Sequence, residues 1–155
     1  MTEFRDRDWS IEAIRDRFVI EDLYDRQLAA AEAHDWESYD TTFSADALVD
    51  LSDFGEPERR YPDYRHWLEA VAEQMPKALR LTGGLRLDLD GDRAQTRVPV
   101  ICCVKMGSPG GENWTWTTLF YNDELTRTEQ GWRIVKRYEE LVYPDALESP
   151  APGSA

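Results

Sequence analysis

The stretch ALRLTGGLRLDLDGD (Ala78–Asp92) decides the fold, because the spacing of apolar residues changes there. Before it, apolar residues recur about every 3.6 positions, as in helices; after it, apolar and polar residues alternate, as in strands. Gly83 and Gly84 predict a kink or bulge, and Asp90-Gly91 is a typical hairpin turn. The C-terminal half therefore predicts an antiparallel sheet.

Three more strands are predicted after that turn. They are RAQTRVPVICCVKM (93–106), WTWTTLFYNDEL (114–125) and WRIVKRYEELVY (132–143). Pro99 favours an edge or a bulge in the first of them. The last residues, PDALESPAPGSA (144–155), are rich in Pro, Ala, Gly and Ser and are expected to be disordered. We therefore expect one domain over residues 1–143.

The N-terminal half predicts about three helices. Ser10 is a plausible N-cap, and apolar residues at roughly helical spacing follow it: Ile11, Ile14, Phe18, Ile20, Leu23, Tyr24, Leu28 and Ala31. One long helix or two short ones fit residues 11–33, and further helices fit 35–43 and 63–75, with a short strand at 47–52. Helices followed by hairpin-linked strands predict an α+β domain, with helices on one face of a curved antiparallel sheet.

Composition excludes two classes of partner. The chain has 155 residues, enough for one core, and a net charge of −13. Such an acidic chain repels phosphate backbones and anionic lipid, so we expect no nucleic-acid or membrane partner. The start, MTEFRDRDWS, lacks a signal-peptide core, and no apolar run reaches membrane-spanning length. The sequence therefore predicts a cytoplasmic protein.

Metal binding is not expected either. Cys102 and Cys103 are adjacent in a predicted strand, so their side chains should point to opposite faces and remain free thiols. His34 and His66 have no cysteine or carboxylate at ligand spacing. We predict no metal site and no cofactor.

Four stretches carry a resemblance to a known family. They are IEDLYDRQLAAAEAHDWESYDTTFSADALVD, LRLTGGLRLDLDGDRAQTRV, WTWTTLFYNDEL and GWRIVKRYEELVY. Together they resemble the nuclear transport factor 2-like superfamily, in particular its SnoaL-like branch of small dehydratases, cyclases and isomerases. The resemblance implies a cone-shaped fold, in which a strongly bent sheet wraps a hydrophobic cavity that the long first helix helps to close.

The resemblance also implies catalytic positions. Related dehydratases and dehydrohalogenases use a carboxylate–histidine dyad, and the position of its acid falls on Glu32. The histidine position reads Arg80, in RLTGG, and a last-strand arginine of many relatives matches Arg137, in WRIVKR. We therefore expect Glu32 to be the base, held by Arg80 and Arg137, which also stabilise negative charge. The alternative for Glu32 is a solvated helix residue.

Further residues are predicted to contact a substrate. The Tyr24 hydroxyl would bind a substrate oxygen, or Tyr24 would simply pack; Trp116 would stack on the substrate, or belong to the core. The other predicted contacts are Leu28, Cys102, Tyr138 and His66, the last either at the cavity mouth or on the helix surface. Alternation does not decide which face of the last strand points inward, since both carry charges.

These observations predict a cofactor-independent enzyme that moves a proton on a small hydrophobic metabolite of polyketide-like or terpenoid-like character. The reaction would be a dehydration, isomerisation or cyclisation. One alternative is a non-catalytic binding or assembly protein of the same fold, favoured by the missing histidine; an epoxide hydrolase of the same fold ranks third. A homodimer or a homotrimer is the expected assembly.

Overall fold

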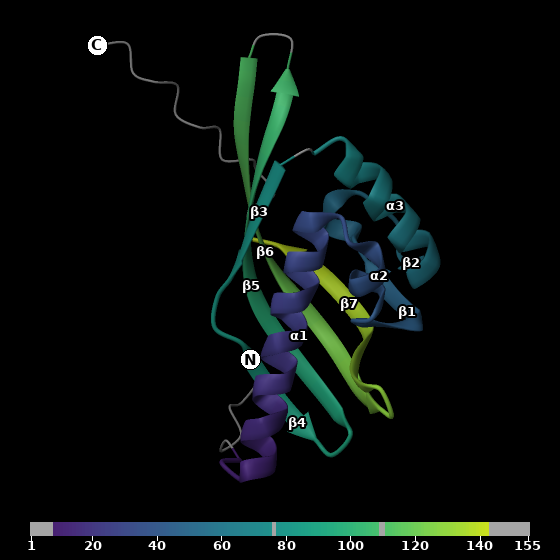
Figure 1. Ribbon diagram of the computed structural model, residues 1–155, viewed down its shortest axis with the longest axis vertical. Helices are drawn as coiled ribbons and strands as arrows, with labels where there is room; N and C mark the ends of the chain where they lie inside the picture. The colour runs from purple at the N-terminus through teal and green to yellow at the C-terminus, as the bar shows by residue number, and fades with distance from the viewer. Residues whose placement is uncertain (1–7, 76, 109–110, 143–155) are drawn as a thin grey trace, which may run out of the picture.

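The structure is a computed structural model that describes residues 8–75, 77–108 and 111–142. Within these residues the fold is α+β, with the helices beside a strongly curved, open sheet (Figure 1). The helices are α1 (Ile11–Ala33), α2 (Trp36–Asp40) and α3 (Tyr61–Glu73), with one 3-10 turn, η1 (Ser52–Phe54). The predicted tail, residues 144–155, lies outside the described part of the chain.

The sheet has the strand order β2-β1-β7-β6-β5-β3, and β4 pairs with β5 beside this path. Its strands are β1 (Phe43–Asp50), β2 (Arg59–Arg60), β3 (Lys77–Thr82), β4 (Arg86–Asp90), β5 (Arg93–Ser108), β6 (Gly111–Thr128) and β7 (Gly131–Leu141). The glycine pair lies at the break between β3 and β4. The Gly83 amide donates to the Pro99 carbonyl at 2.9 Å. On either side of this bond, β3 and β4 pair with successive parts of the long strand β5.

The sheet is mixed, because the N-terminal strand β1 adds a parallel pairing to the antiparallel sheet predicted for the C-terminal half. The pairings among β3, β4, β5, β6 and β7 are antiparallel, as predicted, but β1 pairs with β7 in parallel, with Val49 opposite Arg137. A parallel pair needs a long crossover. Here α3 and the strands before β7 form it, so no turn signal beside either strand reveals the pairing.

Each end of helix α1 is set by one residue with a clear physical role. The Ser10 hydroxyl accepts a hydrogen bond from the Ala13 amide at 3.2 Å, which confirms the predicted N-cap. His34 adopts a left-handed conformation with φ 55° and ends the helix. Asp35 then caps α2 by accepting from the Ser38 amide. Residues 11–33 are therefore one continuous helix.

The buried face of α1 differs from the predicted apolar stripe. Three of the predicted residues are exposed: Ile11, Ile14 and Phe18. Polar residues occupy inner positions instead, because each finds a partner. Asp16 accepts hydrogen bonds from Nη1 and Nη2 of Arg127, at 2.8 and 2.5 Å, and from the Trp132 indole N–H at 3.2 Å. Gln27 donates to the Thr42 hydroxyl at 2.8 Å.

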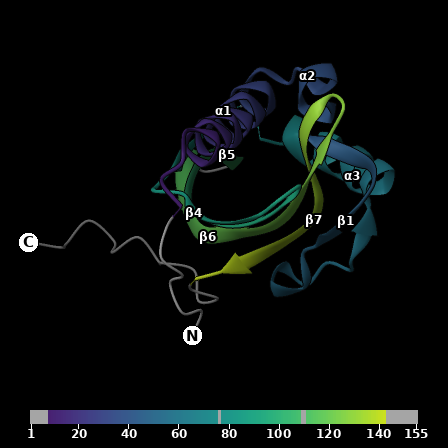
Figure 2. The same cartoon turned by 90° about the horizontal axis from the view of Figure 1, so that it is seen from below.

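The sheet curls around the inner face of α1, as the view along the helix shows (Figure 2). Ile20 and Leu23 of α1 belong to the same buried cluster as Val98, Leu125 and Ile134 of the strands. The helix thus packs on the concave side of the sheet, as predicted. This arrangement directs the side chains on the concave face of β5, β6 and β7 into the interior of a cone.

Candidate functional site

A buried ion pair occupies the centre of the cone. Arg137 of β7 donates to Asp123 of β6 twice, from Nε to Oδ1 at 2.9 Å and from Nη2 to Oδ2 at 2.7 Å, and neither side chain is exposed. The guanidinium lies 3.8 Å from the Tyr121 ring centroid and 5.1 Å from that of Phe43. Its Nη1 is buried and has no hydrogen-bond partner among the described residues. An unused donor in this position suits an oxygen atom of a bound molecule.

Tyr24 of α1 completes the binding of Asp123. Its hydroxyl donates to Asp123 Oδ2 at 2.7 Å and lies 2.6 Å from the Thr96 hydroxyl. The phenol has a single proton, so Thr96 is the donor in that second contact. Burial and the nearby Asp123 charge hold the pKa of Tyr24 well above its usual range. The hydroxyl of Tyr24, which was predicted to bind a substrate oxygen, is therefore bonded within the protein. Leu28, another predicted contact one helical turn further on, is buried in the core.

Glu139 is the second interior carboxylate, and it has fewer partners. The Tyr64 hydroxyl reaches Glu139 Oε1 at 3.5 Å, a long hydrogen bond, and lies 3.4 Å from the Tyr39 hydroxyl. Burial raises the pKa of Glu139, and the charges of Arg137 and Arg80 oppose that rise. The residue as a whole keeps intermediate exposure. Glu139 is therefore a desolvated carboxylate with a single, long hydrogen bond among the described residues.

Arg80 of β3 lies between this interior and the rim. Its side chain interacts electrostatically with Tyr121, Cys102 and Tyr39, and it stands opposite Cys102 in the pairing of β3 with β5. Glu32 at the end of α1 accepts a hydrogen bond from the Arg80 backbone amide at 2.9 Å. Glu32 and Arg80 therefore lie in contact, but through the Arg80 backbone amide and not through the guanidinium that was predicted to hold Glu32.

A small pocket opens at this rim, between the ends of α1 and α3 and the edge strand β3. Its lining comprises Ala31, Glu32, His34, Trp36, Leu68, Ala72, Met75, Ala78 and Arg80. The side chain of Glu32 is exposed there, whereas Arg80 is half-buried. Arg80 thus belongs both to the pocket and to the electrostatic surroundings of Glu139.

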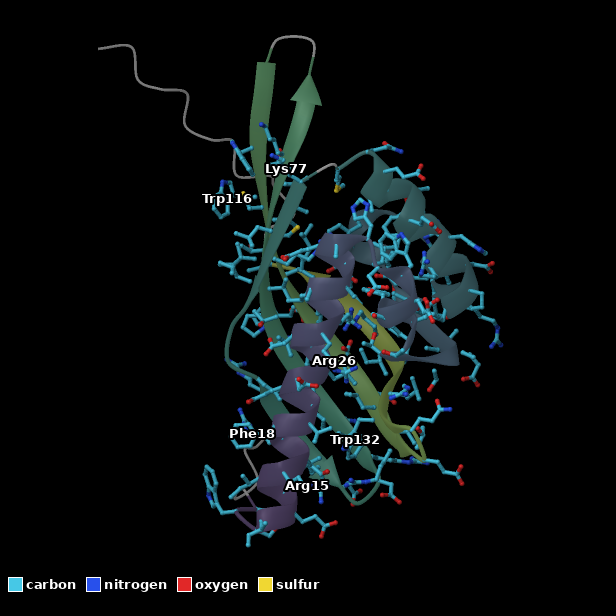
Figure 3. All side chains as sticks on the ribbon, in the orientation of Figure 1. Arg15, Phe18, Arg26, Lys77, Trp116 and Trp132 are labelled. Atoms are coloured by element: carbon cyan, nitrogen blue, oxygen red, sulfur yellow. The ribbon has the colours of Figure 1, made fainter. Side chains whose placement is uncertain are left out.

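The remaining predicted contacts lie in different places. Cys102 is half-buried on the interior side, and burial raises the pKa of its thiol. Trp116 is 56% exposed on the opposite face, and Tyr138, also on that face, donates its hydroxyl to Asp53 at 3.0 Å. His66 is exposed on α3. Figure 3 shows Trp116 on the side of the sheet away from α2 and α3.

A bulge in β7 explains why alternation does not reveal the inward face. Leu125 pairs with Ile134, whereas Glu124 pairs with Lys136, so Val135 has no partner of its own. The extra residue shifts the alternation of inward and outward side chains by one position. Ile134 before the bulge and Arg137 after it consequently both point into the interior, although their numbers differ in parity.

Several interior residues are not predicted by the sequence pattern. They are Tyr39, Tyr64, Thr96, Tyr121 and Asp123, together with Glu139, which shares the parity of Arg137 but has no other distinguishing signal. Asp123 carries a usable signal, since it alternates with Tyr121 and Leu125 and an acid on such an apolar face needs a cationic neighbour. The tyrosines carry none, because a buried tyrosine in a core and one in a site have the same pattern.

Two further features bear on the kind of site. Among the described residues, no three or more His, Cys, Asp or Glu side chains gather as metal ligands would. No helix of that part of the chain is long and apolar enough to cross a membrane.

The fold and the interior define a class of protein: an α+β cone that buries charged and phenolic groups between its first helix and a curved sheet. The model of the SnoaL-like domain matches residues 12–138. The chain therefore belongs to the SnoaL-like family, and the resemblance predicted from its sequence is confirmed.

Relatives support this assignment. An uncharacterised protein of Mycobacterium tuberculosis strain H37Rv is 32% identical over 135 residues, which cover 86% of this chain and 90% of the relative. The structure of a Kribbella flavida protein superposes with a TM-score of 0.79 at 22% identity, covering 84% of this chain and 93% of the other. The hexachlorocyclohexane dehydrochlorinase LinA-type3 of Novosphingobium barchaimii gives 0.75 at 19% identity, with 90% and 94% covered. At these identities the two structures show a shared fold.

Proposed function

We propose that this protein is a cofactor-independent enzyme that transfers a proton on a small hydrophobic metabolite of polyketide-like or terpenoid-like character, in a dehydration, isomerisation or cyclisation. Membership of the SnoaL-like family supports small-molecule chemistry. A structural neighbour is named for the elimination of hydrogen chloride. The observation that carries the proposal is Glu139, a desolvated carboxylate within the influence of two arginines and beside a tyrosine hydroxyl.

The chemistry follows from these groups. A carboxylate whose pKa is raised by burial is a stronger base than one in water. Glu139 would take a proton from a carbon next to a carbonyl, and the electrons of the broken C–H bond would move towards the carbonyl oxygen. The unused Arg137 Nη1 donor would stabilise that developing negative charge. Glu139 would then return the proton, either to a departing β-hydroxyl group, which leaves as water in an elimination, or to another carbon in an isomerisation.

Glu32 remains the second candidate for the base. The family resemblance puts the acid of the catalytic pair at this position, and Glu32 lines the rim pocket with Arg80. In this version Glu32 would act on a substrate held at the rim, and Glu139 would bind it. The two versions differ in which carboxylate is indispensable.

A binding protein without catalysis is the alternative function. The observation in its favour is Arg80, which stands at the position of the dyad histidine and places its amide, not an imidazole, against Glu32. An epoxide hydrolase of the same fold ranks after it. In either case the interior would still be the ligand site.

Deuterium exchange tests the proposal with simple ketones in place of the natural substrate. The protein would be incubated in D2O with a panel of small hydrophobic ketones and β-hydroxyketones, and deuterium incorporation measured by mass spectrometry. We expect Glu139→Gln to lower the exchange rate by roughly 10²–10⁴, the usual contribution of general acid–base catalysis. Glu140→Gln is the matched control, because Glu140 is next to Glu139 in the chain but its carboxylate faces outward and pairs with Arg97.

Three results would change the assignment. A loss of exchange in Glu32→Gln with a normal rate in Glu139→Gln would transfer the role of base to Glu32. Saturable binding of a panel member without exchange would favour the binding protein. Equal rates in both variants and the wild type would exclude proton transfer by either carboxylate.

A further inference from the structure

Arg80 differs from the other shielded arginines in having no partner for its guanidinium. Six buried or half-buried arginines of the described residues each pair with a carboxylate: Arg17, Arg59, Arg65, Arg97, Arg127 and Arg137. Arg133 donates to the Trp132 carbonyl instead. Arg80 is half-buried, yet its guanidinium forms neither an ion pair nor a hydrogen bond with any described residue. A partly desolvated cation without a partner is costly, so this position suits a negatively charged ligand.

The pairing of the strands places Arg80 on the rim side of the interior groups. Paired residues of antiparallel strands lie on the same face, so the inward side chains form rows across the sheet. The row of Arg80 meets β5 at Cys102, and the row of Glu139 meets β5 at Val98. Arg137 belongs to the row beyond Glu139. The rows of Arg80 and Glu139 are thus four residues apart on β5, which is about 13 Å of strand.

An apolar row lies between the rows of Arg80 and Glu139. It comprises Val100 of β5, Leu119 of β6 and Leu141 of β7. The first two are buried and the last is half-buried. The Arg80 side chain extends over this row, since it interacts electrostatically with Tyr121 and Tyr39 further inside. A ligand that follows the same path from the rim meets a cation first, an apolar surface next, and the interior carboxylate last.

The shape and charge of Arg80 favour a carboxylate over other anions. A planar guanidinium donates two parallel hydrogen bonds to a carboxylate. A phosphate monoester carries nearly two negative charges and calls for a second cation, but the other interior arginine, Arg137, is already paired with Asp123. With its net charge of −13, the chain offers an anion no general attraction. One arginine therefore suits one carboxylate.

We propose that the interior takes a hydrophobic oxo acid, whose carboxylate pairs with the Arg80 guanidinium and whose ketone lies beside Glu139 and the unused Arg137 Nη1 donor. The ketone end of this assignment rests on the proposed function, whereas the acid end rests on Arg80. A carbon chain or ring separates the two ends, because the Arg80 side chain covers only part of the distance between the rows. The carboxylate stays intact while Glu139 moves the proton beside the ketone.

Binding of a graded series of ligands tests the acid site. The probes are ω-benzoylalkanoates of increasing chain length and the primary amide of each, titrated by calorimetry into the full chain at neutral pH. We expect the best carboxylate to bind at least roughly tenfold more tightly than its amide, since hydrogen bonds between charged groups contribute more than neutral ones. In Arg80→Gln the carboxylate should lose roughly tenfold to a hundredfold in affinity and the amide little. Arg80→Lys keeps the charge without the planar fork and should fall between the two.

Arg86→Gln is the matched control, because Arg86 is an exposed arginine of β4 and its removal changes the net charge equally. Circular dichroism checks the fold of every variant. A preference for the carboxylate that is lost in Arg80→Gln and kept in Arg86→Gln supports the proposal. Equal affinity for acid and amide, no binding of any member of the series, or the same loss in both variants would overturn it. Displacement of the acid by inorganic phosphate at equal concentration would overturn it too.

The deuterium-exchange assay separates the acid site from the proposed function. Binding of the acids that depends on Arg80, without exchange beside the ketone, would retain the acid site and remove the catalysis. Exchange on neutral ketones, without any preference for the acids, would retain the catalysis and remove the acid site.

Discussion

Arg137 and Asp123 form a bidentate ion pair that is shielded from solvent, with donor–acceptor distances of 2.9 and 2.7 Å. Each charge depends on the other, because a buried ion without its counter-ion is very costly. The same pair lies beside Glu139, on which the proposed chemistry depends. The stability of the fold and the charge of the site are therefore linked.

Removing one member of this pair should be more harmful than removing both. We expect Asp123→Asn or Arg137→Leu to lower the free energy of unfolding by about 3–5 kcal/mol, since an unpaired charge is left in the interior. The double variant Asp123→Asn/Arg137→Leu should be less destabilised than either single variant, because it leaves no unpaired charge. Urea titration of all four proteins measures this. Additive losses would contradict the coupling.

Tyr24→Phe tests the hydrogen bonds that hold Asp123. The change removes one donor to Asp123 and the acceptor of the Thr96 hydroxyl, so we expect a loss of about 1–3 kcal/mol in unfolding free energy. Tyr64→Phe is the control, because its bond to Glu139 is long, 3.5 Å. Its loss should be clearly smaller. Equal losses in urea titration would mean that ring packing, not the Tyr24 hydroxyl, determines the result.

Glu139→Gln should stabilise the protein at neutral pH. The pKa of Glu139 is raised in the folded state by burial, so its contribution to stability is present below the ordinary glutamate pKa and is lost as pH rises through the folded pKa. Each unit of this shift is about 1.4 kcal/mol. Glutamine has no such loss. Urea titrations should therefore show the variant's advantage growing from acid to neutral pH, and a constant difference would contradict it.

Gly83→Ala tests the break between β3 and β4. A Cβ at Gly83 would lie 2.6 Å from Pro99 Cγ, whereas one at Gly84 would meet no atom within 4 Å. We expect Gly83→Ala to lower the free energy of unfolding by about 1–3 kcal/mol through overpacking. Gly84→Ala should change it by no more than about 0.5 kcal/mol. Thermal unfolding of both variants gives the comparison, and equal midpoints would refute it.

The local elements of the fold are predictable from the sequence because each depends on neighbouring residues. The Ser10 cap, the turn at Asp90-Gly91 and the alternation of β5 all rest on contacts within a few positions. The parallel pairing of β1 with β7 is not predictable in this way, since it joins distant segments. Only the family resemblance implies the cone.

The candidate site is predictable only in part, and the reason is the same. Arg137 and Arg80 follow from the resemblance and do reach the interior region. Glu139 escapes prediction as a site residue, because a bulge at Val135 decides which side of β7 faces inward. Trp116 has the alternation of an inner residue but lies on the outer face. Alternation alone cannot distinguish two faces that both carry apolar residues.

The parallel pairing of β1 with β7 has a consequence for the order in which the newly made chain folds. A ribosome adds roughly 5–20 residues per second, so several seconds pass between the emergence of β1 and that of β7. During that interval β1 has only the two-residue β2 as a sheet partner, and its other edge is open to wrong pairings. That edge of β1 is therefore covered only when the last strand of the sheet has been made.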